Sequence, residues 1–235
     1  MRTWTLTVEA SSTSSLSPSE EANKDTAAEL RAVCAAGMVR CATAMEALTC
    51  FVDLLADPCR PARIGAAQAI AALGHWEGVP LLRLKLQVGD PEPEVIGECC
   101  AALLELEPGG GIELVLRLLA SRDTDVRVQA ALALGESRHP QGLTALCQCW
   151  ETERELSVRG LLLTCIGLLR SQESREFLVS LVKEDSSTAG ADAIRALAPY
   201  SMIEELREQV EQAVAASSND QLRAVFDDEF AEPPV

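Results

Sequence analysis

Apolar and small residues along the chain recur in a pattern that repeats at a regular interval. Residues 63–70 read RIGAAQAI, and residues 127–134, which lie 64 positions later, read RVQAALAL. The match continues without a gap into the turns that follow, HWEGV at 75–79 and HPQGL at 139–143. Two intervals of about 32 residues fit that distance, so the pattern predicts another copy in between.

That copy begins at Ile96, which takes the place of the arginine, and small or apolar residues follow it at the same offsets. Further copies begin at Arg159 and Gly190, and a fainter one begins at Arg31. The chain therefore holds five repeats and a weaker sixth.

Each repeat reads as two helices. The first carries small residues close to its starting position, and the second carries apolar residues at helical spacing, as at Ile112, Val115, Leu116 and Leu119. One helical hairpin cannot bury its own apolar face, so neighbouring hairpins stack into a continuous core. The pattern predicts an all-α fold, a right-handed α-solenoid of about five to six helical hairpins.

Aspartates mark the loops before the first helices. Asp57, Asp90 and Asp123 stand where a side chain caps free N–H groups. Asp125 lies two residues before Arg127, and we expect Asp–Arg pairs between neighbouring repeats. Such pairs orient the stack and are structural.

The string VRVQAALALG at residues 126–135, with its copies, resembles the HEAT-like repeats named after phycobilisome lyases, a type of armadillo-like solenoid. The resemblance covers most of the chain. It implies a HEAT-like α-solenoid whose second helices line the inner face. Known members include phycobilin lyase subunits, scaffolds and regulatory adaptors. Ile96 and Gly190 depart from the arginine of the motif, so a continuous arginine ladder is broken at those repeats.

Composition divides the chain into three parts. Residues 1–25 are Ser-rich and expected to be disordered, residues 26–216 form the solenoid, and residues 217–235 form a short capping helix with an acidic tail. Leu222, Phe226 and Phe230 suit a helix that covers the last apolar face, and the alternative is an acidic, aromatic docking tail. Residues 1–8 alternate weakly, which leaves open that they add a strand to a partner.

The charge limits the partners. The chain has 36 acidic and 20 basic residues, a net charge of −16, and this disfavours nucleic acid and anionic membranes and suits a basic protein partner. The nine cysteines include no CxxC motif, and as free thiols they fit a reducing cytoplasm. Neither a signal peptide nor an apolar run of about 20 residues is apparent.

No motif for catalysis, a cofactor or a metal is recognised. His75 and His139 occupy equivalent turns and read as solvated residues without a third ligand. Residues 109–111 are glycines between helices and not a phosphate loop after a strand. Catalysis by a cysteine would need a neighbouring base, which the sequence does not indicate.

Candidate protein-binding residues lie in one turn and on the second helices. Trp76 occupies a turn, where it either packs on a neighbouring hairpin or is an exposed hot spot for binding. The second-helix positions that point away from the core form either a binding groove or a solvated face. These residues are Glu113, Arg117, Thr144, Gln148, Glu151, Glu176, Ser180 and Lys183.

The pattern favours a non-enzymatic scaffold or adaptor that binds proteins on the concave face of the solenoid. The alternative is a bilin lyase subunit or another enzyme-associated factor, which the family resemblance alone implies. A DNA glycosylase of the HEAT-like type is disfavoured because this chain is acidic and poor in aromatic residues.

Overall fold

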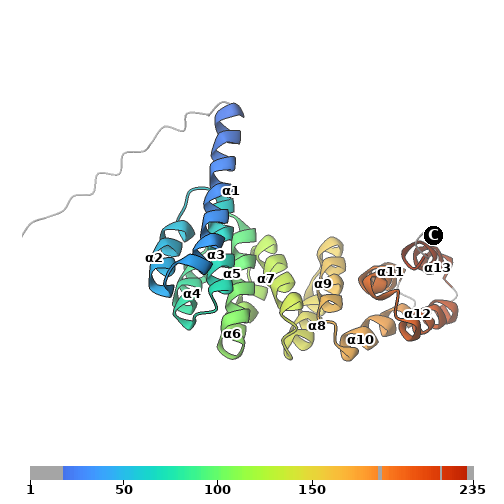
Figure 1. Cartoon of the computed structure of the whole chain (residues 1–235). Coiled ribbons are helices and arrows are strands. Elements are labelled where there is room, and N and C mark those ends of the chain that lie inside the picture. The colour runs from blue at the N-terminus through green and yellow to red at the C-terminus, as the bar shows by residue number, and fades with distance from the viewer. Residues whose placement is uncertain (1–17, 185–186, 218, 232–235) are drawn as a thin grey trace, which may run out of the picture.

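The computed structural model describes residues 18–184, 187–217 and 219–231, and all regular structure in these ranges is helical. The helices stack into an α-solenoid that runs from α1 at one end to α13 at the other (Figure 1). They are α1 (Pro18–Cys41), α2 (Ala44–Leu55), α3 (Arg60–Leu73), α4 (Val79–Val88), α5 (Pro93–Leu106), α6 (Pro108–Leu119), α7 (Thr124–Ser137), α8 (Gly142–Thr152), α9 (Leu156–Leu168), α10 (Gln172–Lys183), α11 (Ser187–Leu197), α12 (Glu204–Ser217) and α13 (Asp220–Glu229), with 3-10 turns η1 (Trp76–Gly78) and η2 (Ala198–Tyr200).

The first helices of the repeats form one closely packed row, in which α1, α3, α5, α7, α9 and α11 each pack on the next. Their small residues make this approach possible. A Cβ atom added to Gly135 of α7 would lie 2.5 Å from the Cys165 carbonyl oxygen of α9, and one added to Gly167 would lie 2.7 Å from the Ala196 carbonyl oxygen of α11. The all-α solenoid that the repeat pattern predicts is confirmed.

The second helices form a more open row. Each of α2, α4, α6, α8 and α10 packs on the first helix that follows it, but α4, α6 and α8 make little contact with one another. The more closely packed pair is therefore a second helix and the first helix that follows it, with an acidic loop between them. This pairing is shifted by one helix from the repeat in the sequence. The second helices α4, α6 and α8 therefore stand farther apart than the first helices, and the expectation that they form the inner row stays a prediction.

Local chemistry explains where several helices begin. Thr43 and Glu46 form a reciprocal capping box at the start of α2. The Asp123 carboxylate accepts hydrogen bonds from the amides of Asp125 and Val126 at the start of α7. Asp57 and Asp90 do not cap a helix in this way, since each accepts from the amide two residues on, inside the loop.

The two ends of the stack differ. At the C-terminal end, α13 packs on α11 and buries Leu222, Phe226 and Phe230, with the two phenyl rings stacked at 4.8 Å. This is the geometry of a capping helix. At the N-terminal end, α1 begins at Pro18, inside the segment expected to be disordered, and the strand suggested for residues 1–8 lies outside the described residues. Within the described ranges, no helix is long and apolar enough to cross a membrane.

Candidate functional site

The starting arginines of several repeats reach across to the next acidic loop. Arg31 pairs with Asp57 at 2.9 Å, and Arg63 pairs with Asp90 at 2.8 Å. The pairing at Arg31 shows that the faint sixth repeat is a real member of the series.

The pair between Arg63 and Asp90 is buried, with the side chains 7% and 1% exposed. Asp90 also accepts from Lys85 at 2.6 Å and from the Glu92 amide. Burial alone would raise the pKa of Asp90, but the hydrogen bonds from Arg63 and Lys85 outweigh it and hold the pKa below its usual value. This carboxylate fastens α3, α4 and the loop before α5.

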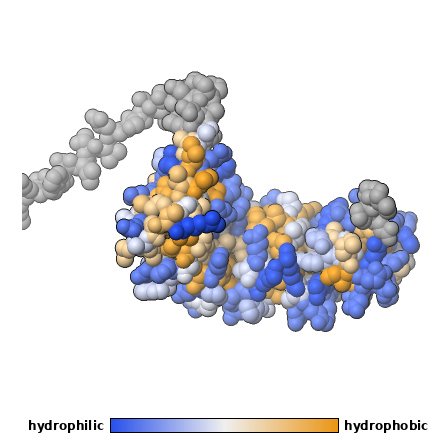
Figure 2. Space-filling model, in the orientation of Figure 1, coloured by the Kyte–Doolittle hydropathy of each residue, from blue (hydrophilic) through white to orange (hydrophobic). Residues whose placement is uncertain are grey.

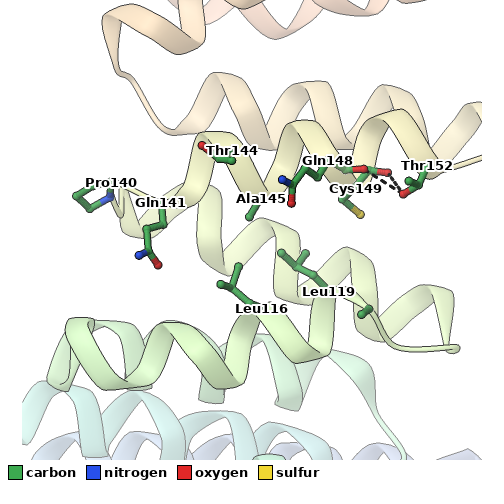
Figure 3. A pocket seen from close by; sticks show the side chains of 10 residues that line it. Leu116, Leu119, Pro140, Gln141, Thr144, Ala145, Gln148, Cys149 and Thr152 are labelled. Atoms are coloured by element: carbon green, nitrogen blue, oxygen red, sulfur yellow. Dashed lines mark hydrogen bonds between the residues drawn. The ribbon is translucent and has the colours of Figure 1, made fainter.

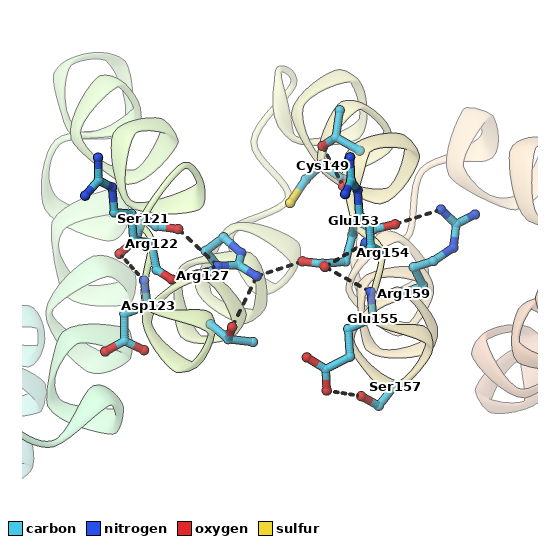
Figure 4. Close-up of polar contacts among 12 residues, drawn as sticks. Ser121, Arg122, Asp123, Arg127, Cys149, Glu153, Arg154, Glu155, Ser157 and Arg159 are labelled. Atoms are coloured by element: carbon cyan, nitrogen blue, oxygen red, sulfur yellow. Dashed lines mark hydrogen bonds and ion pairs between the residues drawn. The ribbon is translucent and has the colours of Figure 1, made fainter.

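The repeat that begins at Arg127 continues this pattern with a glutamate. Arg127 pairs with Glu153 at 2.8 Å and does not pair with its neighbour Asp125 (Figure 4). Hydrogen bonds from the Glu155 amide and from Arg127 lower the pKa of Glu153. The expected ladder between neighbouring repeats is therefore present, with a glutamate in place of the aspartate at this step.

The next arginine, Arg159, donates hydrogen bonds to the carbonyl oxygens of Trp150 and Glu153, and its guanidinium lies 4.1 Å from the centre of the Trp150 ring. The Trp150 ring meets Phe177 of α10 edge to face. The loop equivalent to those of Asp57 and Asp90 includes residues 185–186, which lie outside the described residues. The contacts that are described hold helices together, which is a structural role.

The two repeats that depart from the motif have packing reasons for doing so. Ile96 is 2% exposed and lies in the core, so the ladder is broken there as expected, and Asp123 in the next loop caps α7 instead. Gly190 lies beneath the cap, because a Cβ added to it would come within 3.2 Å of the Leu222 methyl groups of α13.

A groove opens between α6 and α8, where the second helices stand apart (Figure 3). Its volume is about 730 Å³, and its lining contains no charged residue although a quarter of the chain is charged. Thr144 and Gln148 line it, and neither side chain has a hydrogen-bond partner among the described residues. The other lining residues are Leu116, Leu119, Ala120, Pro140, Gln141, Ala145, Cys149 and Thr152.

The structure brings only two of the eight second-helix candidates into this groove. Thr144 and Gln148 lie inside it, while the other candidates on α6, α8 and α10 lie outside its lining. Ser180 is half-buried and donates a hydrogen bond to the Phe177 carbonyl, so it is not free to bind. Outside the groove, the exposed candidates are Glu113, Arg117, Glu151, Glu176 and Lys183.

Sequence reasoning missed the apolar floor of the groove. Leu116 has the helical spacing of a core residue, but the gap between α6 and α8 leaves its side chain only partly buried. Only the spacing of helices that are distant in sequence reveals this. No local signal distinguishes Leu116 from the buried Val115 beside it.

Trp76 is exposed. Its side chain is 74% accessible, so it does not pack on a neighbouring hairpin, and the binding alternative remains. Pro80, Leu84 and Val88 follow at four-residue intervals along α4 and are also exposed, so these three side chains lie along one side of this helix, which begins directly after the 3-10 turn that contains Trp76. We call these four residues the α4 stripe, and its regular spacing was readable in the sequence.

The buried thiols of α5 and α9 have pKa values well above that of a free thiol. Burial raises the pKa of Cys99 and of Cys165 to about 12, so both thiols are protonated at neutral pH. His75 lies 3.3 Å from Glu77, and His139 accepts a hydrogen bond from the Gln141 amide. No three His, Cys, Asp or Glu side chains in the described ranges are grouped to hold a metal ion.

Comparison with known proteins supports the repeat assignment. Residues 79–161, which include α4 to α8, match the family model of HEAT repeats. This part of the chain is thus similar to HEAT repeats. A search of curated proteins finds no match. A crystal structure of an engineered protein shares 18% identity over 91% of each chain, and its TM-score of 0.31 is too low to bear on the fold.

Proposed function

We propose that the protein is a non-enzymatic scaffold that binds a protein partner along its second helices, with the groove between α6 and α8 as the central contact. The observation that carries this proposal is the neutral groove of about 730 Å³ in a chain with a net charge of −16. Leu116 and Ala145 offer apolar contact, while Thr144 and Gln148 each donate and accept hydrogen bonds, as a peptide backbone requires.

The surroundings of the groove suit a mixed or basic partner. Glu113 and Arg117 are exposed on α6 and Glu151 on α8, so charges lie beside the neutral lining and not within it. Binding surfaces commonly combine an apolar centre with a polar rim. The free cysteines favour a reducing compartment such as the cytoplasm for this work. The bilin lyase alternative keeps the repeat resemblance as its only support.

Capture from a native lysate tests the proposal, with the partner then purified and its affinity measured by calorimetry. Gln148→Lys places a positive charge in the neutral groove and is expected to weaken the binding of a mixed or basic partner at least about 10-fold, which corresponds to about 1.4 kcal/mol. Gln87→Lys makes the same change on the exposed side of α4 and is the matched control. Equal affinities for both variants would contradict the groove as the site, and no specific capture would contradict the scaffold function.

Trp76→Ala tests whether the contact extends to the α4 stripe. Because Trp76 is exposed, this change is expected to leave thermal stability within about 0.5 kcal/mol of the wild type. A loss of affinity at unchanged stability would assign the stripe to the same partner.

A further inference from the structure

The side of α1 that faces away from α3 is apolar, and no described residue covers it. Leu30 and Val33 are 61% and 68% exposed, and Cys34, Gly37 and Cys41 are exposed beside them. Figure 2 shows hydrophobic side chains gathered at this end of the stack. We call these five residues the α1 face.

The repeat register shows what kind of surface the α1 face is. In later repeats, the positions equivalent to Val33 and Gly37 lie against the preceding first helix. Gly65 of α3, which corresponds to Val33, lies against Ala32 of α1, and Cys165 of α9, which corresponds to Gly37, lies against Gly135 of α7. The α1 face is thus the stacking face of a HEAT-like repeat.

The same register explains why apolar residues occupy positions 30 and 34. Their equivalents in α3 are Ala62 and Ala66, and both are fully buried. In α5 the equivalents Val95 and Cys99 are fully buried as well. The residues at these positions therefore have the apolar character of core residues, but on α1 they are exposed to solvent.

We propose that the α1 face is the interface of a symmetric homodimer, in which α1 packs antiparallel on α1 of a second copy. An antiparallel pair centred between residues 35 and 36 places Leu30 opposite Cys41 of the second copy and Cys34 opposite Gly37 of the second copy. Both pairs come from within the α1 face, so the surface is complementary to itself, as a two-fold interface requires. Gly37 has open space where a Cβ would lie, so the helices have room for a close approach there.

Charge and length agree with this register. Glu29 and Arg40 are exposed near opposite ends of the α1 face, and the antiparallel arrangement brings Glu29 of one copy towards Arg40 of the other. Helix α1 has 24 residues and is about 36 Å long, which gives the pair an extended contact.

The C-terminal end favours a closed dimer over a filament. Head-to-tail stacking would need an open face at both ends, but α13 covers the C-terminal end with the buried Phe226 and Phe230. Contact between two N-terminal ends therefore covers both α1 faces and leaves no open face to which a third copy could add.

Sedimentation equilibrium of the full chain tests the proposal. The expected mass is twice 25.2 kDa, and association tightens with added salt, because each copy carries a net charge of −16 and the contact is mainly apolar. The double variant Leu30→Glu with Val33→Glu is expected to weaken the dimer at least about 100-fold while its circular dichroism stays that of the wild type. Leu84→Glu with Val88→Glu places the same charges on α4 as the matched control and is expected to leave the dimer intact.

Cross-linking tests the register. With Cys34 and Cys50 changed to serine, Leu30→Cys is expected to react with Cys41 of the second copy through a short bis-maleimide and to give a dimer band, because these two positions lie opposite each other in the proposed register. Adding Cys41→Ser is expected to remove that band, since in this register the two copies of residue 30 lie about 16 Å apart along the helix axes. A band that survives would overturn the antiparallel register.

Three outcomes would overturn the dimer itself. One is a monomer at about 100 μM for both the full chain and a chain lacking residues 1–17. Another is a dimer that appears only after residues 1–17 are removed, which would assign the α1 face to that segment. The third is a dimer that α4 substitutions disrupt and α1 substitutions do not.

Discussion

The two ends of the stack meet the same physical problem in opposite ways. A solenoid exposes an apolar face at each end, and at the C-terminal end α13 covers it with the buried side chains of Leu222, Phe226 and Phe230. At the N-terminal end the α1 face is open, while behind it the buried ion pair between Arg63 and Asp90 fastens the neighbouring helices. The C-terminal end is covered by packed aromatic side chains. The N-terminal end is stabilised by a buried ion pair, and its outer face is exposed.

This difference shows that the interaction that stabilises a terminal repeat is separate from whether the outer face of that repeat is covered. Ion pairs in α11–α13, among the described residues, involve only the exposed Arg195, so charge contributes little to that end. The two ends should therefore respond to different perturbations. Substitutions at each end and a change of pH distinguish the two.

The largest effect is expected at the N-terminal joint. Asp90→Ala leaves Arg63 and Lys85 without their shared carboxylate in a buried site, and the free energy of unfolding is expected to fall by about 4 kcal/mol. Urea denaturation measures this. Asp123→Ala removes a helix cap without breaking a buried ion pair and is expected to cost about 1 kcal/mol. Equal losses for the two variants would contradict the special role of Asp90.

The cap at the other end should be the next most sensitive. Phe230→Ala removes a ring that is 1% exposed and stacked on Phe226, and a loss of about 3 kcal/mol is expected in the stability of the C-terminal helices. Hydrogen exchange should quicken in α11–α13 and stay unchanged in α3–α5. The exposed Asp227→Ala serves as the control on the same helix, and uniform exchange across the chain would argue against a separate cap.

Lowering the pH is expected to destabilise the N-terminal helices before the C-terminal helices. The pKa of Asp90 is lowered in the folded protein, and so is that of Asp57, where burial is outweighed by the hydrogen bonds from Arg31 and the Cys59 amide. The unfolded chain then binds more protons than the folded chain, so the stabilisation is complete above about pH 4 and is lost as the pH falls through the lowered values. Hydrogen exchange measured from pH 6 down to pH 3 should show protection lost in α1–α5 before α13. The reverse order would refute this account.

The smallest effect is expected at the α1 face itself. Leu30→Glu changes a side chain that is 61% exposed in a single copy, so the stability of the monomer is expected to change by no more than about 0.5 kcal/mol. Dilution series of thermal unfolding measure this below the concentration at which copies associate. A large loss in the monomer would mean that Leu30 packs within its own chain.

Much of the fold followed from short-range patterns. The repeat pattern predicted hairpins that stack into a continuous core, and Gly135 and Gly167 do lie against the next first helix. The closing helix followed from the spacing of Leu222, Phe226 and Phe230, whose side chains are buried. These predictions succeeded because helical period and side-chain volume are local properties that packing preserves.

The candidate site followed only in part. The pattern on the second helices identified Thr144 and Gln148 as outward-facing, but it did not identify Leu116 or Ala145 as their neighbours in a groove. It also did not indicate that α4, α6 and α8 make little contact with one another. Such relations depend on the distance between helices of different repeats, which no single repeat encodes.

By itself, the sequence determined the helices and the period of the repeat, because both depend on side chains a few positions apart. The tertiary structure alone decided which acidic loop each arginine reaches, where the second helices separate to open a groove, and that Trp76 and the α1 face lie exposed. The physical reason is that exposure and ion pairing depend on how successive hairpins are rotated and spaced, and that geometry emerges only when the whole stack packs together.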